Sequence, residues 1–227
     1  DEAAPFADEP DVAMARDLSR YGSTSVNIRG IDGVRVLQQV DGVRLPDYYY
    51  GGGPSNITAA IPDGVDMDFL KRVEILRGPA SSLYGSDALG GVVGYLTLDP
   101  KDLLQGKSTA GRWKATWREA DDSLQNTVYG AWQNDLVEGL LALSRREGHE
   151  LKNQGSVGGT GYGRETPNPL DARADGILAK LILKPAPGHR IGLTFEGREQ
   201  DNTVQTQRLS SSLPKVTATR SEERRVG

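Results

Sequence analysis

The chain has 227 residues, of which 37% are hydrophobic and 28 are glycine, and its formal net charge is −4. It contains no cysteine, which excludes disulfides and cysteine metal sites. The lack of a basic excess argues against nucleic-acid binding, and no apolar run approaches the roughly 18 residues of a membrane-spanning helix.

Both ends of the sequence resemble internal positions of a longer protein. The first residues, DEAAPFADEPDVAMARDLSRYG, contain no initiator methionine, no signal segment and no obvious first strand or helix. At the other end, strand-like alternation stops at Thr219, and residues 220–227 resemble a translated sequencing adapter. We therefore expect a fragment that ends in a short non-native tail.

The next part of the chain combines a hairpin with a long loop. Residues 26–47 predict two strands around Asp41-Gly42, because this dipeptide suits a tight hairpin turn and its flanks are rich in valine. Residues 48–69 begin with YYYGGG, contain two prolines and have no sustained period, so they predict a long loop. Loops of that length are usually functional.

A glycine-rich stretch follows at residues 70–98. It predicts a strand at 70–78, one helical turn after Pro79 and a second strand at 90–98. A phosphate loop is excluded, because Gly91 and Val92 stand where lysine and serine or threonine are required.

After residue 105 the pattern changes to segments of about ten residues that alternate apolar with polar side chains, as transmembrane β-strands do. A soluble β-sandwich with one wet face is the alternative. Short links at 134–138 and 185–188 alternate with long links at 149–172 and 201–214, as in outer-membrane barrels. The positions expected to face outward are Trp113, Ala115, Trp117, Leu124, Val128, Gly130, Trp132, Ile177, Ala179, Leu181, Leu183, Ile191, Leu193 and Phe195.

Two stretches resemble a known family. NIRGIDGVRVLQQVDGVRLPD and LKRVEILRGPASSLYGSDALGGVVGYLTLDPKDLL are similar to the plug domain of TonB-dependent outer-membrane receptors. The resemblance implies a mainly β protein with two domains. Residues 1–105 are an α+β plug domain without its N-terminus, and residues 106–219 are the first five to six antiparallel strands of a transmembrane β-barrel of roughly 22 strands. The adapter-like tail at residues 220–227 lies outside the resemblance.

The resemblance implies a transporter of the bacterial outer membrane, not an enzyme. Its partners are TonB, reached through a segment upstream of the plug, and outer-membrane lipid. GGVVGYLTLDPKDLL and DGVRLPD are most similar to the heme and hemoglobin receptor branch, so heme or a heme protein is the expected ligand, with no intrinsic cofactor. A ferric siderophore receptor is the alternative, and a non-transporting adhesion barrel is a third reading.

The heme branch also suggests site residues. A histidine expected between Leu45 and Phe69 is absent, and YYYGGG occupies that loop. Because tyrosinate ligates ferric heme in some proteins, Tyr48 or Tyr50 is the expected iron ligand. Further predicted ligand-binding residues are Tyr49 and His149, and the predicted plug–barrel contacts are Arg29, Glu74 and Arg77, for which an ordinary surface ion pair is the alternative.

The two histidines of the chain are the candidate bases for a catalytic site. His189 follows the short PAPG link and His149 lies near the outer end of an ascending strand, so they are expected at opposite ends of the barrel. A shared Ser-His-Asp arrangement is therefore not expected.

Overall fold

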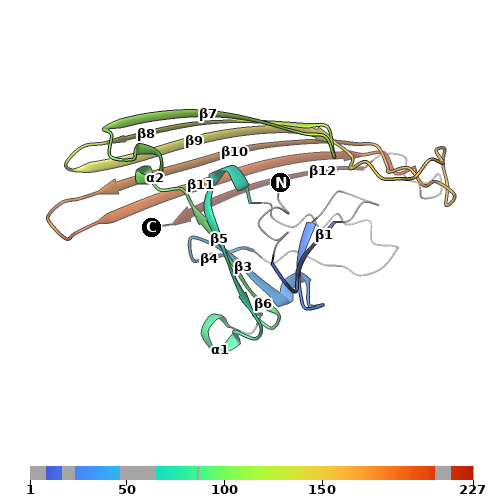
Figure 1. The fold of residues 1–227 in the computed structure, drawn as a ribbon, viewed down its shortest axis with the longest axis horizontal. Coiled ribbons are helices and arrows are strands. Elements are labelled where there is room, and N and C mark those ends of the chain that lie inside the picture. The colour runs from blue at the N-terminus through green and yellow to red at the C-terminus, as the bar shows by residue number, and fades with distance from the viewer. Residues whose placement is uncertain (1–8, 17–23, 47–64, 86, 208–215, 227) are drawn as a thin grey trace. The chain divides into compact units, whose positions relative to one another are not determined.

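The computed structural model describes residues 9–16, 24–46, 65–85, 87–207 and 216–226. The chain forms two compact units, Asp1–Thr97 and Leu98–Gly227. The division falls a few residues before position 105, where the sequence pattern changes. The elements of both units are labelled in Figure 1.

The first unit contains a two-stranded sheet and a four-stranded sheet. In the smaller one, β1 (Val12–Arg16) pairs antiparallel with β2 (Thr24–Ile28). The larger has the order β4-β3-β6-β5, in which β3 and β6 are parallel. Its elements are η2 (Gly33–Arg35), β3 (Val36–Val40), β4 (Val43–Arg44), η3 (Met67–Phe69), β5 (Leu70–Arg77), α1 (Ser81–Tyr84) and β6 (Gly91–Thr97).

The predicted hairpin, strands and helical turn of this unit are confirmed. Asp41 and Gly42 have φ of 46° and 85°, the two positive values that a tight hairpin turn requires. The Asp41 carboxylate accepts hydrogen bonds from the backbone N–H of Thr97, at 2.9 Å, and from its hydroxyl, so the turn is tied to the end of β6. The expectation of no first strand is wrong: β1 forms, and its partner β2 supplies the hydrogen bonds.

The core of the first unit lies between its two sheets. Its buried residues are mostly β-branched, which suits strands that pack on both faces. They are Val12, Val26, Ile28, Val36, Val40, Leu45, Val65, Val93 and Tyr95.

Two glycines of the glycine-rich stretch at residues 70–98 serve this packing. A Cβ on Gly91 would lie 2.3 Å from the carbonyl oxygen of Leu76, and one on Gly90 would lie 2.7 Å from Ile31. The residue Gly91 also has φ of +153°. Only glycine lets the start of β6 approach β5 this closely.

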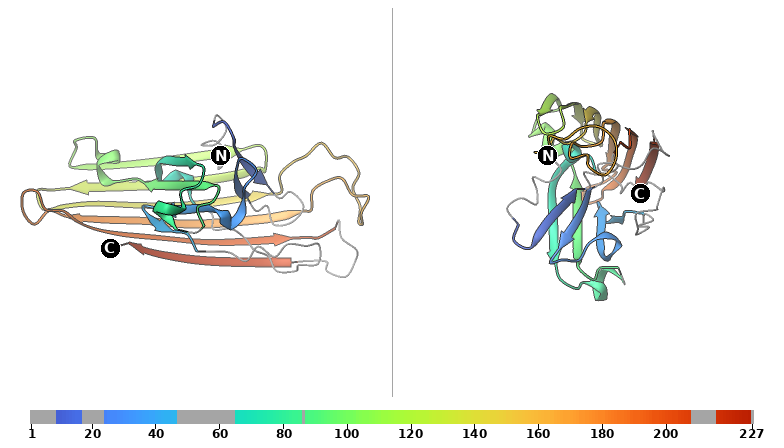
Figure 2. Two further views of the ribbon diagram at one scale, coloured as in Figure 1. Left: turned by 90° about the horizontal axis from the view of Figure 1, so that it is seen from below. Right: turned by 90° about the vertical axis from the view of Figure 1, so that its right-hand side faces the viewer.

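The second unit is a short helix followed by a six-stranded antiparallel sheet in which each strand pairs with the next along the chain. Figures 1 and 2 show these long strands side by side. The elements are α2 (Pro100–Leu104), β7 (Thr109–Arg118), β8 (Ser123–Gln133), β9 (Val137–His149), β10 (Leu170–Leu183), β11 (Ile191–Val204) and β12 (Val216–Val226).

Two features of this unit differ from the sequence pattern. Helix α2 was not predicted, although Asp99-Pro100 with Asp102 is a helix-start signal. Strand β12 continues to Val226, past Thr219, where the alternation stops. The origin of residues 220–227 stays a prediction.

We call the two ends of the sheet the loop end and the turn end. The loop end carries residues 119–122, 150–169 and 205–207, and the turn end carries residues 134–136 and 184–190. Strands β7, β9 and β11 run towards the loop end, because each is followed there by its link.

Candidate functional site

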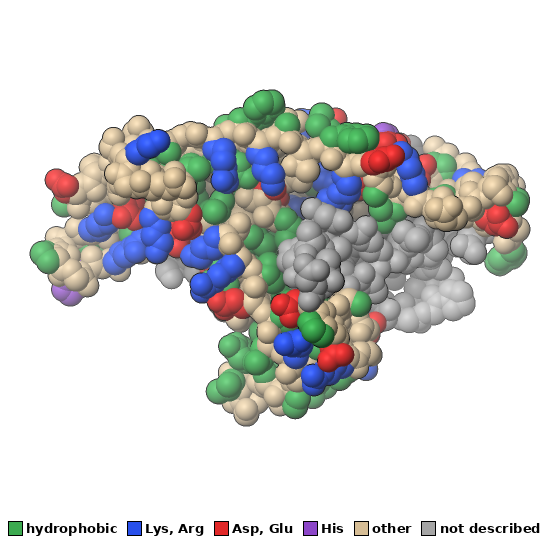
Figure 3. Space-filling model, in the orientation of Figure 1, with side chains coloured by type: hydrophobic (Ala, Val, Ile, Leu, Met, Phe, Trp, Pro, Cys, Tyr) green, Lys and Arg blue, Asp and Glu red, His purple; other side chains and the backbone are tan. Residues whose placement is uncertain are grey.

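One face of the six-stranded sheet is exposed and apolar. Trp113, Trp117 and Trp132 are 67%, 63% and 46% exposed, which contradicts a sandwich that buries them. Figure 3 shows hydrophobic side chains along the upper margin of the sheet. We call this surface the apolar face, and its exposed residues are Trp113, Trp117, Leu124, Val128, Trp132, Leu141, Leu143, Leu181, Leu183, Ile191 and Leu193.

The opposite surface, which we call the polar face, carries hydrogen-bonding and charged groups, many of them buried, between buried apolar residues such as Leu140 and Leu178. Successive side chains of a strand point to opposite faces of the sheet, so these residues alternate along each strand with those of the apolar face. The guanidinium of Arg112 lies 4.2 Å from the ring centroid of Tyr129, a cation–π contact. The buried polar members are Thr127, Tyr129, Glu138, Ser144, Lys180, Glu196 and Asn202.

A sheet that exposes one apolar face is unusual for a protein in water. A contiguous exposed apolar surface marks contact with another protein or with lipid. Buried charged groups on the other face, such as Glu138, Lys180 and Glu196, argue against a simple apolar core between two sheets. Alternation of this kind is the pattern of strands in a membrane barrel.

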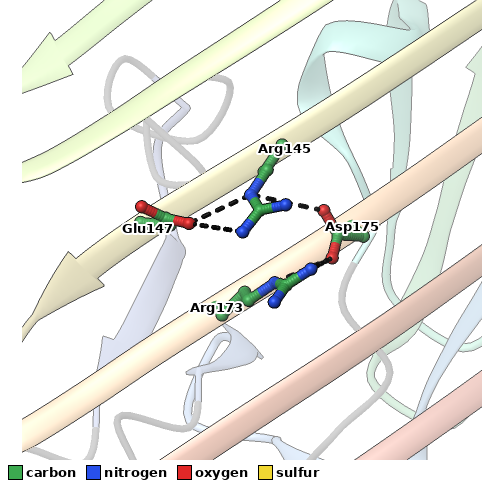
Figure 4. Close-up of polar contacts among 4 residues, drawn as sticks. All are labelled: Arg145, Glu147, Arg173 and Asp175. Atoms are coloured by element: carbon green, nitrogen blue, oxygen red, sulfur yellow. Dashed lines mark hydrogen bonds and ion pairs between the residues drawn. The ribbon is translucent and has the colours of Figure 1, made fainter.

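The apolar face ends in a charged cluster towards the loop end, drawn in Figure 4. Arg145 donates from Nε and Nη2 to Glu147 at 3.0 and 2.8 Å, and its Nε lies 3.9 Å from Asp175. Arg173 donates to Asp175 at 2.9 and 2.7 Å. The cluster thus joins β9 to β10 where the apolar residues stop.

A second ionic network lies at the loop end between β7 and β9. The carboxylate of Asp121 is buried, accepts a 2.6 Å hydrogen bond from Ser123 Oγ, and is bonded by Arg146, with Arg118 3.6 Å away. Burial, the largest single effect, raises the pKa of Asp121. The bond from Ser123 and the charges of Arg146 and Arg118 outweigh it, so the pKa lies below its ordinary value.

The long link 150–169 folds on itself through one arginine. Arg164 is 9% exposed, and its guanidinium donates to the carbonyl oxygens of Gly159 and Pro167, each at 2.7 Å. Gly155 lies so close to Glu165 that a Cβ would meet its carbonyl oxygen at 2.5 Å. The loop is therefore internally braced.

The same link is bonded to the next one. The N–H of Gly161 donates to the carbonyl of Gln207 at 2.8 Å, and the N–H of Gln207 donates to the side chain of Asn168 at 3.0 Å. Two apolar side chains project from this braced structure: Tyr162 is 79% exposed and Val157 is 48% exposed. An exposed aromatic on a preorganised loop is a typical anchor for a protein partner.

The predicted site residues fall in three places. Tyr48, Tyr49 and Tyr50 lie outside the described residues. His149 follows the alternation of Leu141 and Leu143 and thus belongs to the apolar face, where its Nδ1 lies 3.3 Å from Asp171. That position does not favour a ligand role towards the polar face.

The three predicted plug–barrel contacts all have ionic partners within the first unit. Arg29 lies 3.2 Å from Asp11, Glu74 lies 2.7 Å from Arg72, and Arg77 lies 3.7 Å from Glu9 while donating to the carbonyl of Pro10. Their assignment as plug–barrel contacts stays a prediction.

The described parts of the chain show no arrangement that favours a histidine-based catalytic site, a metal site or a membrane-spanning helix. His149 lies at the loop end and His189 in the turn-end link, at opposite ends of the sheet. In the described ranges, no cluster of three or more His, Asp or Glu is arranged to hold a metal ion. Nor is any helix there long and apolar enough to cross a membrane.

Comparison with curated proteins gives hemoglobin-binding relatives. The chain is 29% identical over 220 residues to the hemoglobin-binding protein A of Haemophilus influenzae, covering 88% of the chain and 21% of that protein. It is 31% identical over 186 residues to a probable hemoglobin and hemoglobin-haptoglobin-binding protein 4 of the same species, covering 77% and 18%. The chain thus spans about a fifth of the length of these relatives.

Solved structures with the same fold are iron and heme receptors. The FrpB iron transporter of Neisseria meningitidis (apoprotein form) matches 96% of the chain and 32% of its own with a TM-score of 0.68. The ferric enterobactin receptor of Pseudomonas aeruginosa covers 87% and 30% at 0.60, and the Serratia marcescens hemophore receptor HasR, with hemophore and heme, covers 89% and 32% at 0.57. All three are 20% identical to the chain.

A family model matches most of the first unit. The TonB-dependent receptor plug domain matches residues 6–92, which run from before β1 to the start of β6. The two-faced sheet that follows is the fold that the solved receptors share with this chain. The plug domain and the fold that follows it therefore place the chain in the family of TonB-dependent receptors.

Proposed function

We propose that the intact protein is an outer-membrane receptor that imports heme, taken from hemoglobin or another heme protein. The observation that carries this proposal is a plug domain followed by a sheet with an exposed apolar face and a buried polar face. Such a sheet suits a barrel wall between lipid and a polar interior. The names of the curated relatives support hemoglobin as the heme source.

The test is growth and uptake in an iron-starved host that lacks its own heme receptors. The intact protein is expected to support growth on heme and on hemoglobin. A ferric siderophore receptor is the second candidate, favoured by the similarity in fold to the ferric enterobactin receptor. Growth on a ferric siderophore, with none on heme or hemoglobin, would replace the first proposal by the second.

We further propose that Tyr48 or Tyr50 ligates the heme iron. Tyrosinate is an established ligand of ferric heme, and alternation in an extended segment would put these two rings on one side and Tyr49 on the other. Each tyrosine is changed to phenylalanine, which keeps the ring and removes the ligating oxygen. Loss of the tyrosinate absorption band in one variant supports the assignment, and three unchanged spectra contradict it.

The braced loop supplies a surface for the heme-carrying protein. Tyr162 and Val157 project from a loop whose conformation is fixed by hydrogen bonds, so little conformational entropy is lost when a partner binds. The change Tyr162→Ser is expected to weaken hemoglobin binding at least tenfold and to leave heme uptake intact. The matched control is Leu136→Ser, because Leu136 is 64% exposed at the turn end.

The energy source is proposed to be TonB, acting on a segment upstream of the plug. Deletion of that segment in the intact protein is expected to abolish uptake while binding at the cell surface remains. Loss of binding together with uptake would assign the segment a folding role. The apolar face is proposed to contact outer-membrane lipid.

A further inference from the structure

One guanidinium on the polar face carries a buried donor without an acceptor. Arg198 lies in β11, and its Nε atom is buried and has no hydrogen-bond partner among the described residues. Alternation along β11 puts Arg198 on the polar face, because Glu196 and Asn202, two and four positions away, are both buried there. Buried polar atoms have a hydrogen-bond partner in the large majority of cases. The Nε atom of Arg198 therefore calls for an acceptor from outside the described residues.

Three other cations on the polar face already have acidic partners. Arg118 and Arg146 both lie beside the carboxylate of Asp121, and Nζ of Lys180 lies 3.1 Å from Oδ1 of Asp99. Their charges are compensated within the chain. The guanidinium in β11, whose Nε atom no described residue bonds, is therefore the candidate on this face for binding an external anion.

The two strands on one side of Arg198 offer no charge at its level. Its register partner on β10 is Gly176, which is paired in turn with Ser144 on β9. Glycine has no side chain, and the hydroxyl of serine is neutral. On the other side the register partner is Glu222 of β12, which lies within residues 220–227, the segment that we predict to be non-native. The strands β9 and β10 therefore leave the charge of this guanidinium uncompensated in its own row.

Arg198 lies near the middle of β11, which Figure 1 shows inside the sheet between β10 and β12. Val204 at the loop end is six residues away, which is about 20 Å along an extended strand. A ligand that enters the proposed barrel at the loop end and leaves it at the turn end passes this level. The position therefore suits a contact with the transported ligand.

We propose that Arg198 binds a propionate carboxylate of heme on the polar face. A carboxylate accepts two parallel hydrogen bonds from a guanidinium, and the unbonded Nε is one of the two donors that a side-on arrangement uses. The contact satisfies the buried donor and compensates both charges. The inference rests on the proposed function, because heme is the ligand that this function names.

The test compares heme with its dimethyl ester, in which both propionates are neutral. The affinity of the intact protein for each ligand is measured by absorption titration in detergent. The parent is expected to bind heme at least fivefold more tightly than the ester. Arg198→Gln keeps an amide donor and removes the charge and the paired donors, so it is expected to bind the two ligands within twofold of each other.

The matched control is Arg112→Gln on the same face. The guanidinium of Arg112 lies over the ring of Tyr129, 4.2 Å from its centroid, and thus has a partner within the chain. This variant is expected to keep the preference of the parent for heme to within twofold. Loss of the preference in Arg112→Gln as well would overturn the assignment to Arg198, because any cation of the face would then serve.

A second measurement covers the case in which Arg198→Gln fails to assemble. Equal affinities of the parent for heme and for the ester overturn the proposal without any variant, and so does a preference for heme that survives in Arg198→Gln. Arg198→Lys keeps the charge but not the paired donors, and its affinity for heme is expected to fall at least twofold while its affinity for the ester stays unchanged. Equal losses for both ligands would show a purely structural role for Arg198. A parent protein that binds neither ligand would instead contradict the proposed function.

Discussion

Replacement of Asp121 by asparagine tests whether the ionic network at the loop end holds β7, β8 and β9 together. Asparagine keeps the shape of the side chain and removes the charge that Arg146 and Arg118 face. A hydrogen bond to a charged group contributes about 1.5–3 kcal/mol, and breaking a fully buried ion pair costs about 3–5 kcal/mol. The two arginine side chains are 19% and 23% exposed and can reach water, so we expect a loss of about 2 kcal/mol.

The loss should depend on pH in a defined direction. The pKa of Asp121 in the folded protein lies below its ordinary value of 3.8, so the carboxylate favours the folded state. This contribution is fully present above the unfolded-state pKa and is lost as pH falls through the folded-state pKa. The difference between the parent and Asp121→Asn is therefore expected to be constant between about pH 5 and 7 and to shrink below about pH 4.

The assay is thermal unfolding of the intact protein in detergent, followed by the loss of β-sheet circular dichroism. Asp122→Asn is the matched control, because Asp122 is the neighbouring carboxylate but is 47% exposed and pairs with Lys152. An exposed pair contributes about 0–1 kcal/mol, so this control should unfold close to the parent. Equal unfolding temperatures for the two variants, or a larger loss for Asp122→Asn, would refute the argument.

Two further pairs of substitutions probe the sheets. Leu141→Arg puts a charge in the middle of the apolar face and is expected to cost about 2–4 kcal/mol, whereas Leu124→Arg, opposite Glu147 at the loop end, should cost about 0–1 kcal/mol; thermal unfolding in lipid measures both, and equal costs would contradict contact with lipid. Gly91→Ala forces a Cβ against the Leu76 carbonyl and should prevent assembly of the plug, whereas Gly94→Ala, with its nearest atom at 3.7 Å, should be tolerated; limited proteolysis distinguishes them, and an intact Gly91→Ala plug would contradict the packing argument.

The faces of the long strands could be predicted because alternation is a local property of an extended chain. Leu124, Val128 and Trp132 are exposed and Thr127 and Tyr129 are buried, as period two requires. The same alternation predicts the face on which His149 lies, because an even number of residues separates it from Leu141 and Leu143 in β9. The predicted ligand role of His149 rests on its position near the outer end of the strand, and the face of the strand is a separate property.

The features that could not be predicted depend on residues that are distant in the sequence. Strand β1 has no strong pattern of its own and forms through its pairing with β2. The bracing of the long link depends on Arg164 reaching two carbonyls in a folded loop, which no spacing in the sequence encodes. The partner of Lys180 could not be predicted either, because 81 residues separate it from Asp99.

The charged cluster also defines how deeply the proposed barrel wall sits in lipid. Arg145, Asp175 and Glu199 are register partners across β9, β10 and β11, and the next outward row towards the turn end is Leu143, Ile177 and Gly197. On all three strands, the outward side chains thus change from charged to apolar between the same two rows of register partners. Charged residues are costly at the bilayer centre and cost little near its surface, so this row belongs at the interface. The braced loop with Tyr162 then stands on the solvent side of that row, where a protein partner can reach it.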